Sequence, residues 1–187
     1  MYHIKSDKRA QTSANLIYKG LCSCIKEKPF DQITIQDIQI ASSVSRSTFY
    51  RHFDCLSDVL YWQCDLKFYD VLSTYEPNAN GDVYDFAHYF LSYWAHHSEI
   101  LELLLQLNRV DIIYSCHMNN TALFQQKYAQ LSPIPTEHID YFLGMRTGIF
   151  IGILMTWLKN GKRESIDEMF QIMQIQFEFI RQTGFII

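Results

Sequence analysis

Three consecutive polar residues, Arg46, Ser47 and Thr48, have the types and spacing that can recognise the edges of DNA bases. They directly follow Ser45, whose hydroxyl can cap a helix over residues 46–53. A helix that enters the major groove needs hydrogen-bonding side chains facing outward at its N-terminal end, and these three residues supply them. Further along the same helix, the side chains that can reach DNA phosphates are Tyr50, Arg51 and His52.

A second short helix is predicted directly before this one. Thr34 and Asp37 form a capping box that opens it. The two helices, at residues 34–41 and 45–53, are joined by a three-residue turn, which is typical of a helix-turn-helix. The same spacing occurs in helical hairpins that are merely polar, so the spacing alone leaves both interpretations open.

The sequence lacks the common motifs of enzymes and of metal sites. There is no phosphate-binding glycine loop, no Gly-x-Ser-x-Gly and no His-Glu-x-x-His. No two histidines stand four residues apart, and Cys22 and Cys24 would project about 200° apart around a helix. We therefore expect a protein that is not an enzyme and that needs no metal or cofactor.

The composition favours an all-helical cytoplasmic protein. With 187 residues, 48% of them hydrophobic, the chain can bury the core of one or two domains, and seven Gly and four Pro are too few for a turn-rich β fold. The five cysteines show no framework spacing, which indicates reduced thiols. No signal peptide is evident, and the most apolar stretch, residues 147–158, is about half a bilayer span, so we expect no membrane segment.

Charge is distributed unevenly along the chain. The net charge of −4 excludes a uniformly basic surface, but residues 1–60 carry eight Lys and Arg against six Asp and Glu. The remaining residues are strongly acidic on balance. This asymmetry predicts different partners for the two parts.

Apolar residues recur at steps of three and four along most of the chain, which predicts about nine helices and no strand. The natural division follows the third helix, giving a helix-turn-helix domain at residues 1–54 and a ligand-sensing and dimerisation domain at residues 55–187. The predicted helices cover residues 7–25, 34–41, 45–53, 54–72, 82–94, 98–107, 111–131, 136–160 and 165 onward.

The run from Phe30 to Phe53 resembles the DNA-binding segment of the tetracycline-repressor (TetR) family. Its second half, Val-Ser-Arg-Ser-Thr-Phe-Tyr-Arg-His-Phe, matches the family pattern most specifically. The resemblance covers about residues 8–60 and implies an all-helical homodimer that binds double-stranded DNA at a palindromic operator, usually as a repressor, with an effector in the C-terminal region. It implies base-reading roles for Arg46, Ser47 and Thr48 and phosphate contacts for Thr34, Tyr50 and His52.

One position departs from the family pattern. Leu56 stands where the family usually has Lys, at the start of the fourth helix. The departure implies a lost phosphate contact, which either weakens DNA binding or shifts it onto Lys5, Lys8 and Arg9. It also keeps open the alternative of a helical ligand-binding or interaction protein with a degenerate DNA-binding end.

The C-terminal region resembles the family more loosely. The runs Gly148-Ile-Phe-Ile-Gly152 and Trp157-Leu-Lys-Asn-Gly161 are similar to the last two helices of a subgroup that accompanies dihydroxyacetone-kinase operons. Some members of that subgroup answer to a protein partner. The effector is therefore either a small molecule or a protein co-regulator.

Aromatic residues crowd the segments between Phe86 and Trp157. Such rings either fill an ordinary core or wall an apolar pocket, in which hydroxyl and indole groups orient the ligand. In the second case we expect a small apolar or aromatic effector. The candidate pocket residues are Tyr89, Phe90, Tyr93, Trp94, Tyr114, Tyr128 and Trp157.

The last two helices carry features of a helix–helix interface. Three glycines repeat every four residues on one helix and leave a smooth stripe, while the final helix has a seam of apolar residues at heptad spacing. Either feature can pack within one subunit or across a dimer. The predicted dimer-interface residues are Gly144, Gly148, Gly152, Phe170, Met173 and Phe177.

Overall fold

The computed structural model describes residues 1–76, 85–128 and 136–184, without the side chains of residues 122–128 and 136. These residues form nine α-helices and no strand, which confirms the predicted all-α fold. The predicted helix ends at residues 82–84 and 129–131 lie outside the described residues. The helices are α1 (Lys8–Glu27), α2 (Ile35–Ser42), α3 (Arg46–His52), α4 (Leu56–Ser73), α5 (Asp85–His96), α6 (Glu99–Gln106), α7 (Val110–Tyr128), α8 (Ile139–Lys159) and α9 (Ile166–Thr183).

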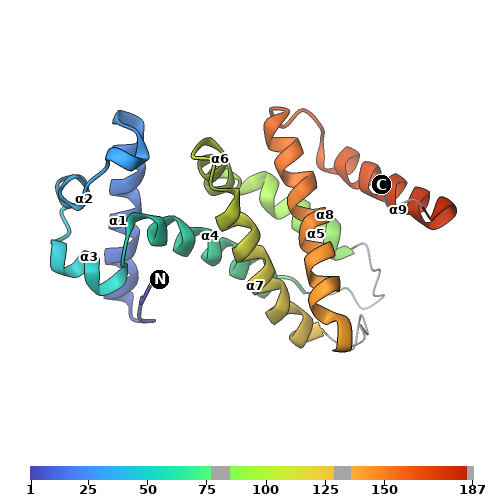
Figure 1. Ribbon diagram of the computed structural model, residues 1–187, viewed down its shortest axis with the longest axis horizontal. Helices are drawn as coiled ribbons and strands as arrows, with labels where there is room; N and C mark the ends of the chain where they lie inside the picture. Colours follow the sequence, from blue (N-terminus) through green and yellow to red (C-terminus); the bar gives the residue numbers. More distant parts are fainter. Residues whose placement is uncertain (77–84, 129–135, 185–187) are drawn as a thin grey trace.

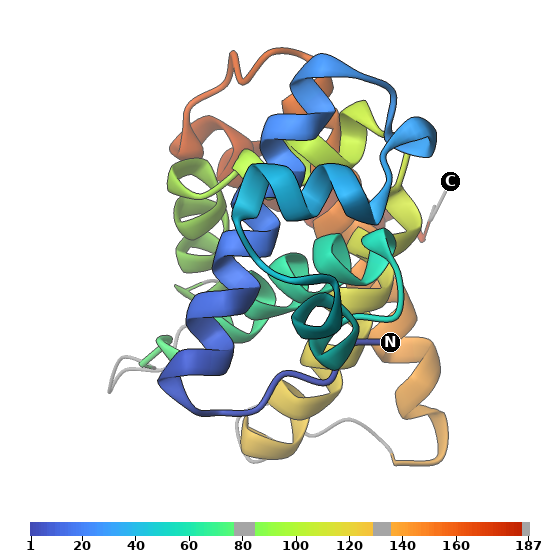
Figure 2. The same cartoon turned by 90° about the vertical axis from the view of Figure 1, so that its left-hand side faces the viewer.

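Two groups of helices are joined through α4. Figure 1 shows α1, α2 and α3 gathered at one end, α4 leading away from them, and α5 to α8 forming a larger bundle from which α9 extends. Figure 2, which looks at the small end, shows α1 crossing it with α2 and α3 beside it. Short 3-10 turns at Phe30–Gln32 and Thr136–His138 precede α2 and α8.

Local capping determines where the helices begin. The Thr34 side chain accepts from Asp37 N at 3.3 Å, and Thr34 N donates to Asp37 Oδ2 at 2.7 Å. The same reciprocal pairing of Ser165 with Glu168 opens α9. Each box satisfies backbone N–H groups that have no partner within the helix, so both predicted starts are confirmed.

The buried core is continuous from the small end into the bundle. In the small end, Phe53 packs on Trp62 of α4 with ring centroids 5.8 Å apart. In the bundle, Phe68 of α4 packs on Trp94 of α5 at 4.7 Å. Burying each of these rings stabilises the fold by about 1.5–3 kcal/mol, so α4 fixes both groups of helices.

Helix α8 is long and apolar enough to span a membrane by length and composition alone. It packs against α7, and its buried side chains include Leu143, Phe150 and Leu154. The core helices of soluble proteins pass the same test, so this feature is weak evidence for a membrane span.

Helices α1 and α2 approach closely at Gly20. A Cβ at this position would lie 2.9 Å from Ser42 Cβ and 3.1 Å from Ser42 N. Ser42 is itself buried, and its hydroxyl donates to Ile38 O at 2.6 Å. Because the contact is formed by the Cβ and backbone atoms of Ser42, which no side-chain rotation can move, a larger residue can be accommodated only if the two helices move apart.

We expect Gly20→Ala to destabilise the protein. Overpacking of this kind costs about 1–3 kcal/mol, which exceeds the gain of about 1 kcal/mol from the better helix former. Urea denaturation measures the difference. Asn15→Ala, at an exposed position of the same helix, is the control and should leave stability equal or slightly higher. A Gly20→Ala protein as stable as this control would contradict the tight contact.

Candidate nucleic-acid interface

Helix α3 exposes its N-terminal residues and buries its opposite side. Arg46 and Ser47 are exposed and Thr48 is half-buried. Phe49 is fully buried on the other side, and its ring lies 5.8 Å from that of Phe53. The predicted base-reading residues therefore lie together on an outward surface that two buried rings hold in place.

Hydrogen bonds order the start of α3. Ser45 Oγ accepts from Thr48 N at 3.2 Å and lies 3.0 Å from Ser47 Oγ and 2.9 Å from Thr48 Oγ1. The Arg46 guanidinium lies over the Tyr50 ring, 5.5 Å from its centroid. The Ser47 and Thr48 hydroxyls can replace their hydrogen bonds to Ser45 with hydrogen bonds to a base edge. The Arg46 guanidinium, stacked on the Tyr50 ring, keeps its N–H donors available for a base.

Thr34 occupies the N-cap of α2, and its hydroxyl is already engaged. It donates to Asp37 Oδ2 at 2.6 Å, and the same carboxylate oxygen lies 2.5 Å from Lys28 Nζ. The hydrogen bonds from Lys28 and Thr34 hold the pKa of Asp37 well below its usual range. Thr34 can reach a phosphate only if its hydroxyl turns away from this carboxylate.

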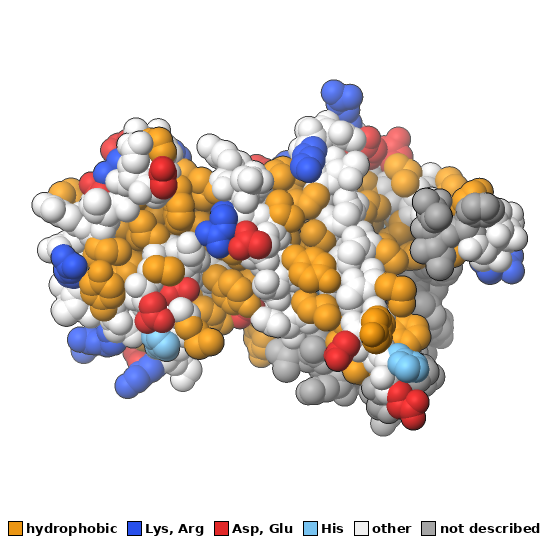
Figure 3. Space-filling model, viewed as in Figure 1, with side chains coloured by type: hydrophobic (Ala, Val, Ile, Leu, Met, Phe, Trp, Pro, Cys, Tyr) orange, Lys and Arg blue, Asp and Glu red, His pale blue; other side chains and the backbone are white. Residues whose placement is uncertain are grey.

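The other predicted phosphate contacts divide into exposed and buried residues. Tyr50, Lys8 and Arg9 are exposed, and Figure 3 shows basic side chains along the lower edge of the small end. His52 is only 4% exposed, and its Nδ1 has no hydrogen-bond partner within the described residues. Burial and the nearby Arg51 lower the pKa of His52, so the ring is neutral at pH 7.

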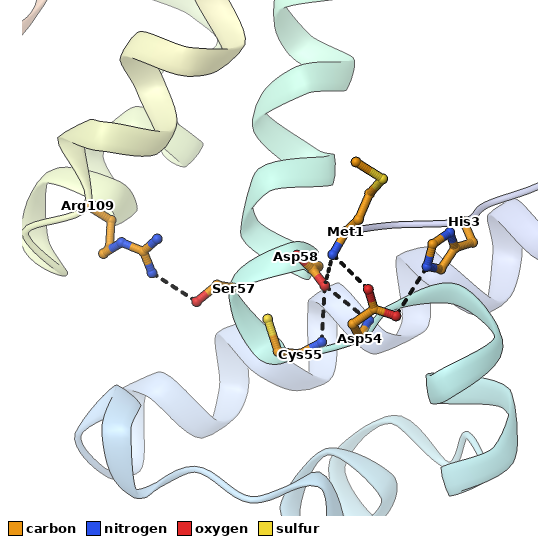
Figure 4. A network of polar contacts seen from close by, with 7 residues as sticks. All are labelled: Met1, His3, Asp54, Cys55, Ser57, Asp58 and Arg109. Carbon is orange, nitrogen blue, oxygen red and sulfur yellow. Dashed lines mark hydrogen bonds and ion pairs between the residues drawn. The ribbon is translucent and has the colours of Figure 1, made fainter.

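Polar contacts join this end of the molecule to the bundle, as Figure 4 shows. Arg109, just before α7, donates to Ser57 Oγ at 2.9 Å and pairs with Asp111. At the start of α4, Asp58 Oδ2 accepts from the backbone N–H of Cys55 at 3.1 Å. The position that departs from the family pattern, Leu56, is half-buried against the core.

The predicted pocket residues do not all come together. Phe90 and Trp94 lie side by side in the core, whereas Tyr89 Oη lies 2.6 Å from Thr74 Oγ1 and Tyr93 donates to Asp70 at the C-terminal end of α4. Tyr114 is 43% exposed. Trp157 donates to Glu164 O at 2.9 Å. The side chain of Tyr128 lies outside the described residues.

A buried histidine that the pocket prediction missed stands among these rings. His117 Nδ1 lies 3.0 Å from Thr147 Oγ1, and its ring meets the Phe90 ring edge-on at 5.5 Å. Burial lowers the pKa of His117 to about 3, so it is neutral at pH 7. Nearby, the indole N–H of Trp94 has no hydrogen-bond partner among the described residues. Spacing along the sequence gives no signal for either environment.

The structure places the predicted interface residues in two different environments. Gly148 and Gly152 are exposed, and a Cβ added at either would meet nothing within 4 Å. Gly144 is half-buried near Tyr114. The heptad seam instead packs within the subunit, since Met173 is buried and Phe170 meets His88 of α5 at 5.4 Å.

The outward faces of α8 and α9 carry apolar side chains. Figure 3 shows hydrophobic side chains over the region where these helices lie in Figure 1. The residues involved are Tyr141, Met145 and Ile149 of α8 and Ile172, Ile175 and Phe179 of α9.

No group of three or more His, Cys, Asp or Glu in the described part of the chain could hold a metal ion.

Comparisons with known proteins found one family model and a solved structure with a similar fold. The family model TetR_C_8, described as a transcriptional regulator C-terminal region, matches residues 81–178, just over half of the chain. The crystal structure of Lin0861 from Listeria innocua is similar to this structure with a TM-score of 0.76 at 14% sequence identity. The similarity covers 95% of this chain and 96% of that one, which shows a shared fold. Among curated proteins, none matches the chain.

The low pKa of Asp37 predicts a pH-dependent contribution to stability. A carboxyl whose pKa is lower in the folded state stabilises the protein above its unfolded pKa, about 3.9, and loses that effect as the pH falls further. Asp37→Asn should therefore lower the melting temperature at pH 7 and lower it less at pH 3. Asp31→Asn, at an exposed position nearby, is the control. A gap between wild type and Asp37→Asn that is equal at both pH values would contradict this assignment.

Proposed function

This chain belongs to the TetR family of transcriptional regulators, and on that basis we propose that it is a dimeric, cytoplasmic repressor that binds a palindromic operator and is released by an effector. Helices α1–α3, within residues 1–54, form the DNA-binding domain, and residues 55–187 sense the effector and dimerise. The observation that carries the proposal is the outward surface at the start of α3, where Arg46, Ser47 and Thr48 stand together.

Contacts to the DNA backbone come from residues around this surface. Tyr50, Lys8 and Arg9 are exposed and can donate to phosphates directly. Thr34 can contribute after its hydroxyl leaves Asp37. His52 must change its position to reach a phosphate, because its side chain is buried.

Dimerisation would bring two copies of α3 into successive major grooves, about 34–36 Å apart. The exposed faces of α8 and α9 supply an apolar surface, and Gly148 and Gly152 allow close approach of a second helix. The seam of Phe170, Met173 and Phe177 supports this surface from within the subunit.

The effector is expected to be small and apolar or aromatic. Phe90, Trp94 and the neutral His117 form an aromatic cluster between α4 and α8 that suits an apolar or aromatic ligand, and the charge near it is that of Arg146, which helps to lower the pKa of His117. An effector must bind the DNA-free state better, because equal affinity for both states does not change the affinity for DNA.

Two alternatives to a repressor released by a small molecule remain. The first is a regulator controlled by a protein co-regulator, and the second is a helical ligand-binding or interaction protein with a degenerate DNA-binding end. Leu56, in place of the usual basic residue, favours weaker DNA binding.

Substituting Arg46 tests the base-reading role. Arg46→Ala should cost about 1–3 kcal/mol on a duplex selected by the wild-type protein from a random pool, and it should affect a scrambled duplex less. Fluorescence anisotropy at one fixed salt concentration measures both affinities. Arg163→Ala removes the same charge at an exposed position between α8 and α9, and it controls for long-range electrostatics.

Tyr50→Phe provides a contrast in the same assay, because a phosphate contact carries no base identity. It should weaken both duplexes by a similar factor. If Arg46→Ala also weakens both duplexes equally, the base-reading assignment is wrong. If wild type prefers no duplex from the pool, the alternative with a degenerate DNA-binding end is favoured.

A charge on the outward face of α9 tests the dimer. Ile175, which is 70% exposed, lies within the proposed interface. Ile175→Lys should yield monomers in sedimentation velocity, because burying an unpaired charge is costly. Ile40→Lys, at a 74% exposed position on α2, should sediment as wild type. An Ile175→Lys protein with the wild-type sedimentation coefficient would remove this face from the interface.

A further inference from the structure

Residues 1–4 lie along the end of α3, and we refer to them as the N-terminal strap. Tyr2 pairs with Phe53 in an antiparallel bridge, and the backbone N–H of His3 donates to His52 O at 2.8 Å. Asp54 N donates in turn to Met1 O at 3.4 Å. Figure 4 shows Met1 and His3 beside Asp54, directly after α3. The strap therefore attaches to the residues that end this helix.

The side chain of Tyr2 reaches in the other direction, toward α4 and α7. Its hydroxyl donates to Asp65 Oδ2 at 2.5 Å, and the other oxygen of the same carboxylate accepts from Asn120 Nδ2 at 2.7 Å. Its ring lies 6.2 Å from that of Tyr61. One carboxylate of α4 thus holds both the strap and a buried amide of α7.

The Tyr2 hydroxyl stays protonated to a higher pH than an ordinary tyrosine. Burial and Asp65 raise the pKa of Tyr2, so its hydroxyl remains a donor. Asn120 is only 4% exposed, and its Nδ2 also donates to Cys116 O at 2.9 Å. The Asn120 amide is therefore held by its own helix, so its hydrogen bond to Asp65 depends on where α7 lies.

We propose that the N-terminal strap couples the position of α7 to the C-terminal end of α3, through Asn120, Asp65 and Tyr2. The coupling is a property of the protein alone, and only its consequence for an operator rests on the proposed function. Helix α3 has seven residues, so a displacement at one end changes the direction of the whole helix. A shift of α7 would move Asp65 and Tyr2 together, and the backbone bond from His3 would carry the shift to His52.

A double-mutant cycle tests the coupling, because contacts in sequence along a structure do not by themselves demonstrate it. Tyr2→Phe removes the hydroxyl and keeps the ring, and Asn120→Ala removes the amide. Hydrogen exchange of the His3 and Phe53 amides, measured without DNA, should become about two- to tenfold faster in either variant. In the Tyr2→Phe background, Asn120→Ala should have no further effect on these two amides.

Tyr69→Phe, at an exposed position on α4, is the matched control and should leave both amides unchanged. If Asn120→Ala unfolds the protein, Asp65→Asn removes the shared carboxylate instead and should mimic Tyr2→Phe. Exchange effects that simply add, or a Tyr2→Phe protein whose His3 and Phe53 amides exchange as in wild type, would overturn the proposal. Because no DNA is present, these outcomes are independent of the Arg46→Ala result. If that result supports operator binding, Tyr2→Phe should also weaken it.

Discussion

The packing of α4 into both halves of the core is the constraint on which the rest of the structure depends. Its first half buries Val59, Leu60 and Trp62, and Trp62 packs on Phe53 at the end of α3. Its second half buries Phe68, which packs on Trp94. Protein interiors are close-packed, so α4 cannot move without displacing rings at both ends. The orientation of α3 is therefore tied to the arrangement of the bundle.

The sequence predicted the fold class and the starts of several helices because those depend on local interactions. The capping boxes at Thr34 and Ser165 involve residues three apart, and their hydrogen bonds form wherever the helix forms. The outward position of Arg46 followed equally from its place among the polar residues directly after the Ser45 cap. Features within one or two helical turns were thus accessible without the structure.

Features that depend on which surfaces meet were not accessible in the same way. The heptad seam of α9 indicated burial but not its partner, and the structure places Met173 in the subunit's own core. His52 has a side chain suited to phosphates, yet packing places it inside. The contact of Tyr2 with Asp65 joins residues 63 positions apart, and no periodicity in residues 1–4 signals it. The high content of aromatic residues likewise did not indicate which of them are buried, such as Phe90, and which are exposed, such as Tyr114.

Polar contacts attach α4 to α7 and to the residue before it at several points, including Asn119 with the Tyr61 hydroxyl, and the distance between the outer two contacts has a mechanical consequence. Arg109 binds Ser57 in the first turn of α4, and Asn120 binds Asp65 eight residues later, about 12 Å along the helix at 1.5 Å per residue. A single contact would let α4 pivot, whereas two contacts also fix its tilt relative to α7. Breaking one hydrogen bond to a charged group costs about 1.5–3 kcal/mol, less where water replaces the partner. Allosteric coupling is typically about 1–3 kcal/mol, so the binding of an effector can supply the energy to break one of these contacts and loosen that point of attachment. An effector that leaves all of these contacts intact must move α4 and α7 as one unit.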